Sequence, residues 1–195
     1  MKKMILAAAF LLATATAVLA QNDEISLGAK AGVNFSSLNG DNTDGLDGRT
    51  SFHLGAVVHI PITEKFAFQP ELLYSAQGAS RDGSFDGEEF FDSETTFRLD
   101  YITLPLLADY LVLDGLSIQA GPQIGININS EVEFNGETAD LENTNTLDLS
   151  LAAGLQYVLN QGIFFQGRYT LGLSEISEDG DAKNGVLSIS VGYRF

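Results

Sequence analysis

The chain has 195 residues, of which 45% are hydrophobic, and its 26 acidic and 10 basic residues give a formal net charge of −16 at pH 7. Such an acidic chain repels nucleic acid and anionic membrane surfaces unless cations intervene, and its hydrophobic content excludes a disordered chain. It contains no cysteine, which excludes disulfides, thiol catalysis and cysteine-bound metals.

The first twenty residues have the build of a secretory signal peptide. The basic stretch MKK precedes the apolar run MILAAAFLLATATAV, and the small-residue sequence VLA ends just before Gln21. This order of regions predicts cleavage after Ala20, so we expect residues 1–20 to be removed and residues 21–195 to form one domain. An uncleaved membrane anchor is the alternative, although the apolar run is short for one.

The rest of the chain alternates apolar and polar residues in separate stretches, which is the pattern of β-strands with one apolar face. The predicted strands cover residues 25–36, 50–61, 66–79, 97–112, 116–129, 147–159, 163–174 and 186–195. Few stretches hold a helical period, and no segment after the signal peptide approaches the length of a membrane-spanning helix.

The connections between these strands alternate in length. Short ones have the sequences PITEK, LDG and NQG, whereas long ones cover residues 38–49, 80–96, 130–146 and 175–185. If consecutive strands are antiparallel, all short turns lie at one end and all long loops at the other. This asymmetry is typical of outer-membrane barrels, which have tight periplasmic turns and long external loops.

The apolar face of the strands is expected to contact lipid. The four long loops hold 18 of the 26 acidic residues, while the polar faces of the strands are mostly Gly, Ser, Gln and Asn. A soluble barrel would need Lys and Glu along its outward face, so the sequence predicts an all-β, eight-stranded antiparallel transmembrane β-barrel, a meander with short periplasmic turns and four long external loops.

The fourth strand could take either of two registers. We favour Ile102, Leu104, Leu106 and Tyr110 facing outward, because the other register would push Asp109 into lipid. A bulge near Pro105 would change this phase.

The chain ends in VLSISVGYRF, with apolar residues at every second position back from Phe195. We expect this last strand to pair with the first, which removes both sheet edges. The ending resembles the C-terminal signal by which bacterial outer-membrane barrels are recognised, which implies that Tyr193 and Phe195 are read by the barrel-assembly machinery. The stretches LGAKAGVNFSSL, FAFQPELLYSAQG, YITLPLLADY, AGPQIGI and SISVGYRF resemble the small "porin family" or PorT-like outer-membrane β-barrel domain, which implies a Gram-negative outer membrane.

The interior of an eight-stranded barrel is about wide enough for its own side chains. The charged residues predicted to face inward are Lys30, Glu71, Asp109, Asp148, Arg168 and Arg194, accompanied by neutral His53 and His59. Because buried charges are costly unless paired, we interpret them as a structural ion network that fills the lumen. The alternative is a narrow porin-like passive channel for small solutes.

We predict neither an enzyme nor a cofactor. The candidates for a nucleophilic arrangement are His53 and His59 with Ser51, Glu71 or Asp148, and they would have to lie within hydrogen-bond reach of one another. An outer-membrane lipid-modifying enzyme is therefore a remote alternative. The loop sequences NGDNTDGLDG and SEDGDAKNG superficially resemble calcium loops but do not fit the EF-hand pattern. They allow at most weak surface binding of Ca²⁺ or Mg²⁺, which would bridge acidic loops to lipopolysaccharide phosphates.

Aromatic residues in the acidic loops are candidate contacts for a partner, namely Phe85, Phe90, Phe91 and Phe134. They could instead pack against one another or extend the barrel above the membrane. The function predicted from the sequence is therefore an integral outer-membrane barrel that is structural or binds at the cell surface. Its expected partners are outer-membrane lipid, lipopolysaccharide and an unidentified external ligand or protein.

Overall fold

The structure is a computed structural model that describes residues 25–40, 46–81, 95–134, 137–141, 144–177 and 181–195. The predicted signal peptide, residues 1–20, lies outside the described residues. Within those ranges, no helix has the length and apolar composition to cross a membrane.

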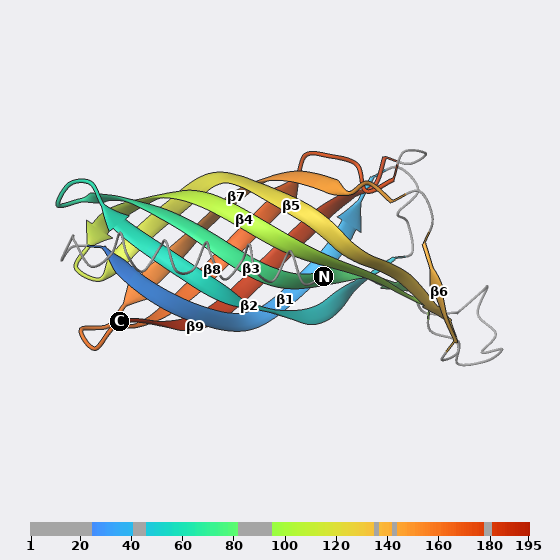
Figure 1. Cartoon of the computed structure of the whole chain (residues 1–195), viewed down its shortest axis with the longest axis horizontal. Coiled ribbons are helices and arrows are strands. Elements are labelled where there is room, and N and C mark those ends of the chain that lie inside the picture. Colours follow the sequence, from blue (N-terminus) through green and yellow to red (C-terminus); the bar gives the residue numbers. More distant parts are fainter. Residues whose placement is uncertain (1–24, 41–45, 82–94, 135–136, 142–143, 178–180) are drawn as a thin grey trace, which may run out of the picture.

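The described chain is built from antiparallel strands joined in sequence order (Figure 1). They are β1 (Ser26–Asn39), β2 (Asp47–Pro61), β3 (Phe66–Arg81), β4 (Thr95–Leu113), β5 (Leu116–Phe134), β6 (Glu137–Asp140), β7 (Leu147–Val158), β8 (Ile163–Gly172) and β9 (Lys183–Arg194). All strands except the short β6 form a closed barrel in the order β4-β3-β2-β1-β9-β8-β7-β5, with β4 pairing to β5.

Pairing of the first and last strands closes the barrel, as the sequence predicts. Ala29 lies opposite Tyr193 and Phe35 opposite Leu187 in the β1–β9 ladder. The backbone N–H of Phe195 also donates to the carbonyl of Leu27 at 2.8 Å. The predicted eight-stranded antiparallel barrel is therefore confirmed.

The third long connection differs from the prediction, because much of it is strand. The β4–β5 ladder continues as far as Thr95 opposite Phe134, and Glu131 of β5 pairs with Asp140 of β6. Neighbouring antiparallel strands satisfy each other's backbone hydrogen bonds, so the ladder begun in the barrel continues beyond it. Within the part of the chain that the structure describes, β6 pairs with β5 alone and ends this external ribbon.

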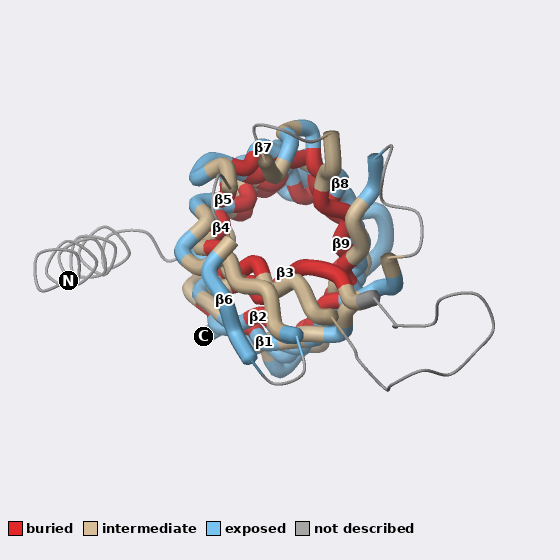
Figure 2. The backbone as a smooth tube through the Cα atoms, turned by 90° about the vertical axis from the view of Figure 1, so that its right-hand side faces the viewer, coloured by how far each residue is buried: buried red, intermediate tan, exposed pale blue. Residues whose placement is uncertain are grey.

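The strands alternate between a buried inner face and an exposed apolar outer face, which Figure 2 shows as an inner red and an outer blue side of the ring. In β8, for example, Phe164 is completely buried while the next residue, Phe165, is 51% exposed. An exposed apolar band around a closed barrel is the arrangement that lipid requires.

The favoured register of the fourth strand is confirmed. Asp109 points inward and is buried, whereas Leu104 and Tyr110 face outward and are exposed. The irregularities of the β4–β5 ladder lie between Asp100 and Tyr101 and between Leu111 and Leu113, not near Pro105.

Candidate functional site: the lumen and its two ends

An ion triad lies at the centre of the lumen. Glu71 of β3 pairs with Lys30 of β1, whose Nζ is 2.7 Å from Oε2, and with Arg168 of β8. The guanidinium of Arg168 is bidentate, with Nη1 at 2.8 Å from Oε2 and Nη2 at 2.6 Å from Oε1. All three residues are at most 5% exposed. A bidentate, charge-assisted contact fixes both side chains in one geometry.

The triad spans the barrel. In the order of the sheet, β2, β1 and β9 separate β3 from β8 on one side, and β4, β5 and β7 separate them on the other. Glu71 and Arg168 therefore project from opposite walls and meet in the middle. Nearer the external end, Asn184 of β9 donates to the hydroxyl of Tyr101 of β4 at 3.2 Å, and these two strands also lie on opposite walls.

Four buried glutamines extend the triad into a layer across the lumen. Gln166 donates to Gln119 at 2.6 Å and accepts from Lys30 at 2.6 Å. Gln69 donates to Glu71 at 2.9 Å and to Gln156 at 3.3 Å. We call the ion triad together with Gln69, Gln119, Gln156 and Gln166 the lumen layer.

Sequence reasoning missed these glutamines because it followed formal charge. A signal was present in the alternation, since each glutamine directly follows an apolar outward residue: Phe68, Ile118, Leu155 and Phe165. Successive side chains of a strand point to opposite faces, so all four amides point into the barrel, where a buried amide must find hydrogen-bond partners.

The other three charges of the predicted network do not join the triad. Asp109 accepts from Ser117, Gln119 and Gln156, at 3.1, 2.5 and 3.3 Å. Asp148 accepts from the hydroxyls of Ser150 at 2.6 Å and Ser174 at 3.3 Å. Arg194 donates to Gln69 at 2.9 Å and lies 5.5 Å from the ring centroid of Phe164. Among the described residues, none of these three forms an ion pair.

The arrangement considered for nucleophilic catalysis is not formed. The ring nitrogens of His53 lie 2.8 Å from the amide oxygen of Asn34 and 2.7 Å from the hydroxyl of Ser190. Ser51 instead donates to the carbonyl of Ala76 at 2.7 Å. With both of its ring nitrogens bound to other side chains, His53 does not act as a base for Ser51 in this arrangement.

Side-chain donors also bind the external part of β3. Asn34 of β1 donates to the carbonyl of Ala76 at 2.8 Å, and Ser36 of β1 donates to that of Gly78 at 2.8 Å. The β2–β3 ladder is irregular between Gly48 and His53, at the same level. Inward side chains of β1 thus bond to backbone carbonyls of β3 where the β2–β3 ladder is interrupted.

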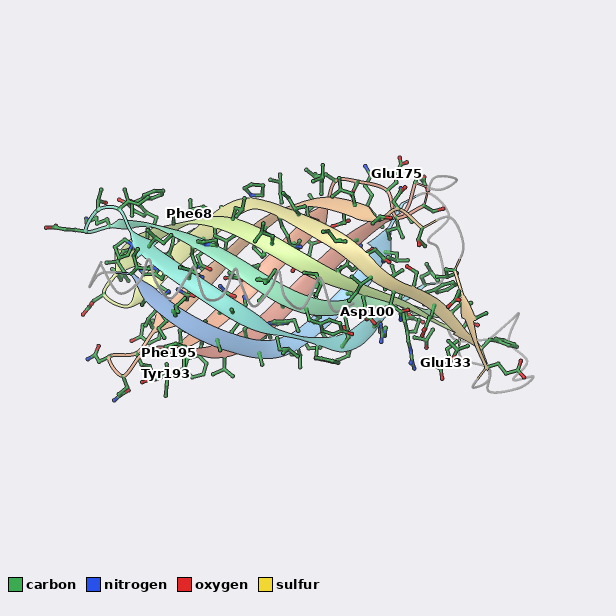
Figure 3. The ribbon with its side chains drawn as sticks, viewed as in Figure 1. Phe68, Asp100, Glu133, Glu175, Tyr193 and Phe195 are labelled. Carbon is green, nitrogen blue, oxygen red and sulfur yellow. The ribbon has the colours of Figure 1, made fainter. Side chains whose placement is uncertain are left out.

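The external ribbon carries the described part of the predicted loop contacts. Phe134 ends β5 and is 51% exposed, whereas Phe85, Phe90 and Phe91 lie outside the described residues. Glu133 forms an ion pair with Arg98 of the neighbouring strand. Figure 3 shows Asp100, Glu133 and Glu175 toward the end of the barrel opposite the short turns. Within the described ranges, no group of three or more His, Asp or Glu side chains could hold a metal ion.

The two residues of the predicted assembly signal lie at the short-turn end (Figure 3). Tyr193 is 49% and Phe195 72% exposed, and their ring centroids are 6.2 Å apart. Both rings face outward, where an assembly factor or the membrane interface would meet them.

The fold is that of known outer-membrane proteins. Neisserial surface protein A (NspA) superposes with a TM-score of 0.61 at 14% identity, covering 87% of this chain and 97% of that one. Ail, the attachment invasion locus protein of Yersinia pestis, gives 0.54 at 17% identity, covering 88% and 99%. At such identities the similarity shows the fold alone.

The family is shown by the sequence itself. No curated protein matches the chain significantly. Residues 19–178, however, match the family described as outer membrane protein beta-barrel domain. The chain therefore belongs to this family, and it is a β-barrel protein of the Gram-negative outer membrane.

Proposed function

We propose that this protein is a non-conducting outer-membrane barrel that acts through its external surface. The observation that supports this most directly is the Glu71–Arg168 ion pair, which joins opposite walls of the barrel. A solute crossing the lumen would have to break a buried bidentate pair, and breaking such a pair is costly.

The space on either side of the lumen layer is consistent with a plug. Toward the external end there is a void of about 20 Å³, bounded by Lys30, His53 and Thr103 among others, which is roughly the room that one water needs. Toward the short turns there is a cavity of about 640 Å³, and Gln156 of the layer forms part of its wall. The two spaces are separated by the hydrogen-bonded side chains of the layer.

The external surface offers the features of a contact site. The β5–β6 ribbon stands beyond the barrel with Phe134 exposed, and the outer edge of β6 has no strand partner among the described residues. The long connections hold 18 of the 26 acidic residues. Complementarity of charge would favour a basic partner, or an anionic one bridged by Ca²⁺ or Mg²⁺.

This preference contrasts with one of the similar structures. Ail has been crystallised with the heparin analogue sucrose octasulfate, a polyanion. The acidic loops here would repel such a ligand, so we propose a different partner chemistry on the same fold. We also propose that the barrel has no enzymatic activity, since Ser51 and His53 bind other groups. The resemblance to the porin or PorT-like barrels enters this proposal for the fold alone. It does not carry the function of a porin with it.

Single-channel recording tests the closed lumen. Purified mature protein inserted into a planar bilayer is expected to give no steady conductance steps. A variant carrying both Glu71→Ala and Arg168→Ala, which removes the ion pair across the barrel, is expected to conduct if it folds. Steady steps from the wild-type protein would favour the narrow passive channel and would refute the plugged lumen.

The surface role has its own test. Barrels in lipid nanodiscs are titrated with oligolysine and, separately, with a heparin analogue. Saturable, salt-sensitive binding is expected for oligolysine only, and a variant with Glu131→Gln and Glu133→Gln is expected to bind oligolysine more weakly. Preferential binding of the polyanion without divalent cations would contradict the proposed partner chemistry.

A further inference from the structure

A large cavity opens at the short-turn end of the barrel, below the lumen layer. Its volume is about 640 Å³, and its mouth is formed by the β2–β3 turn with Glu64 and Lys65, by Gly115 and by Val158. Its walls include Asp109 and Arg194. We call it the vestibule. The volume falls within the range of small-molecule sites, and because short turns of outer-membrane barrels face the periplasm, so does the vestibule.

Asp109 is the unusual group in the vestibule wall. It is 5% exposed, and the hydrogen bonds that it accepts from Ser117, Gln119 and Gln156 all end on Oδ2. Among the described residues, no donor reaches Oδ1 and no cation forms a salt bridge with this carboxylate. Arg194 of the same wall interacts electrostatically with Asp109 but does not form an ion pair with it. A cationic group in the vestibule could therefore add a direct, charge-assisted contact at Oδ1.

A bare metal ion fits this site poorly. The described residues contain no cluster of three or more acidic or His side chains, whereas Ca²⁺ takes six to eight oxygen ligands. A primary ammonium group needs fewer acceptors and makes a strong charge-assisted hydrogen bond with one carboxylate. The free oxygen of Asp109 therefore suits an ammonium group.

The same cavity also carries positive charge. The guanidinium of Arg194 lies on its wall, where Nη2 is held by Gln69 and Nε has no hydrogen-bond partner in the described structure. Lys65 stands at the mouth, beside Glu64. The formal charges of these lining groups cancel, which disfavours a simple cation and favours a ligand that carries both signs.

We propose that the vestibule is a periplasm-facing binding site for a small zwitterion, of the class of amino acids and short peptides with a free amino terminus. The ammonium group of the ligand donates to Oδ1 of Asp109. Its carboxylate accepts from Arg194 inside or from Lys65 at the mouth. The site does not depend on the external surface, so it stands or falls separately from the proposed function.

Three tripeptides separate the two charges of the ligand. The mature protein, refolded in detergent micelles, is titrated at neutral pH with trialanine, with N-acetyl-trialanine, which lacks the ammonium, and with trialanine amide, which lacks the carboxylate. Calorimetry is expected to show saturable binding of trialanine. Each blocked peptide is expected to bind about tenfold more weakly or worse, because each loses one charge-assisted contact.

A matched pair of variants assigns the ammonium contact. Asp109→Asn keeps the size of the side chain but removes its charge, and it is expected to weaken trialanine binding by about tenfold or more. Asp148→Asn makes the same change at the other unpaired buried acid, outside the vestibule lining, and is expected to bind like wild type. Folding of both variants is checked by the mobility shift of unheated samples on gels.

Either of two results would overturn the proposal. One is that wild-type protein binds trialanine no better than its acetylated form, or not saturably at all. The other is that folded Asp109→Asn binds trialanine as tightly as wild type. If Asp109→Asn does not fold, the comparison of the three peptides with wild-type protein decides alone.

Discussion

Removing the charge of Glu71 is the sharpest test of the lumen layer. Glu71 is 2% exposed and is the shared partner of Lys30 and Arg168. Glu71→Gln would leave two buried cations without a counter-charge. Breaking one buried ion pair costs about 3–5 kcal/mol. Since both cations depend on the same carboxylate, we expect a loss at the upper end of that range.

The loss is measured as the free energy of unfolding in urea, with the mature protein refolded into lipid vesicles. The chain has no Trp, so the far-ultraviolet circular dichroism of the strands reports folding. Asp148→Asn is the matched control, because among the described residues Asp148 accepts from the hydroxyls of Ser150 and Ser174 and forms no ion pair. Its cost is expected to be about 1–2 kcal/mol.

A second variant separates loss of charge balance from loss of packing. Replacing the whole triad by apolar residues of similar volume, as Lys30→Met with Glu71→Leu and Arg168→Met, is expected to recover most of the stability, since no unpaired charge remains. The reasoning would be refuted if Glu71→Gln cost no more than Asp148→Asn, or if the apolar triple variant were less stable than Glu71→Gln alone.

Three further predictions concern the wall of the barrel. Leu151→Arg, at an exposed mid-strand position, is expected to lower the free energy of unfolding in vesicles by about 2–4 kcal/mol. The same change at Leu147, nearer the external end, should lower it less. Equal losses would contradict the lipid-facing assignment. Gly32→Ala places a Cβ against backbone atoms of β9 and is expected to cost about 1–3 kcal/mol, whereas Gly167→Ala meets nothing within 4 Å and should be close to neutral in the same assay. Phe195→Ala should lower the amount of folded barrel in cells without slowing refolding in detergent, and equal slowing in both would argue against a role in recognition.

The sequence determines the strands and their faces. Alternation is a local property with a period of two residues, so it can be followed along each strand without knowledge of its neighbours. Asp109 shows how strong this information is. The register that would place its charge in lipid is the costlier one, and β4 has the other register, with Asp109 buried inside. The alternation of short and long connections likewise indicates antiparallel order and which end faces outside the cell.

The sequence is less informative where pairing continues beyond the apolar band. Residues 130–146 have the acidic, turn-rich composition of a loop, yet β5 continues to Phe134 and is followed by β6. Outside the membrane no lipid face enforces alternation, so backbone pairing between β4, β5 and β6 proceeds with little trace in the residue pattern.

Only the tertiary structure decides which inward side chains meet. The alternation along each strand places Glu71 and Arg168 inside the barrel. Their contact depends on whether the two residues lie at the same height on opposite walls, and this height is fixed by the strand register of the closed barrel. The same register gives Asp109 and Asp148 neutral partners in place of the predicted ion pairs, and it brings four glutamines from separate strands into one layer. Alternation reports the side of a strand on which a residue lies. The height at which distant strands face each other is a property of the closed ring.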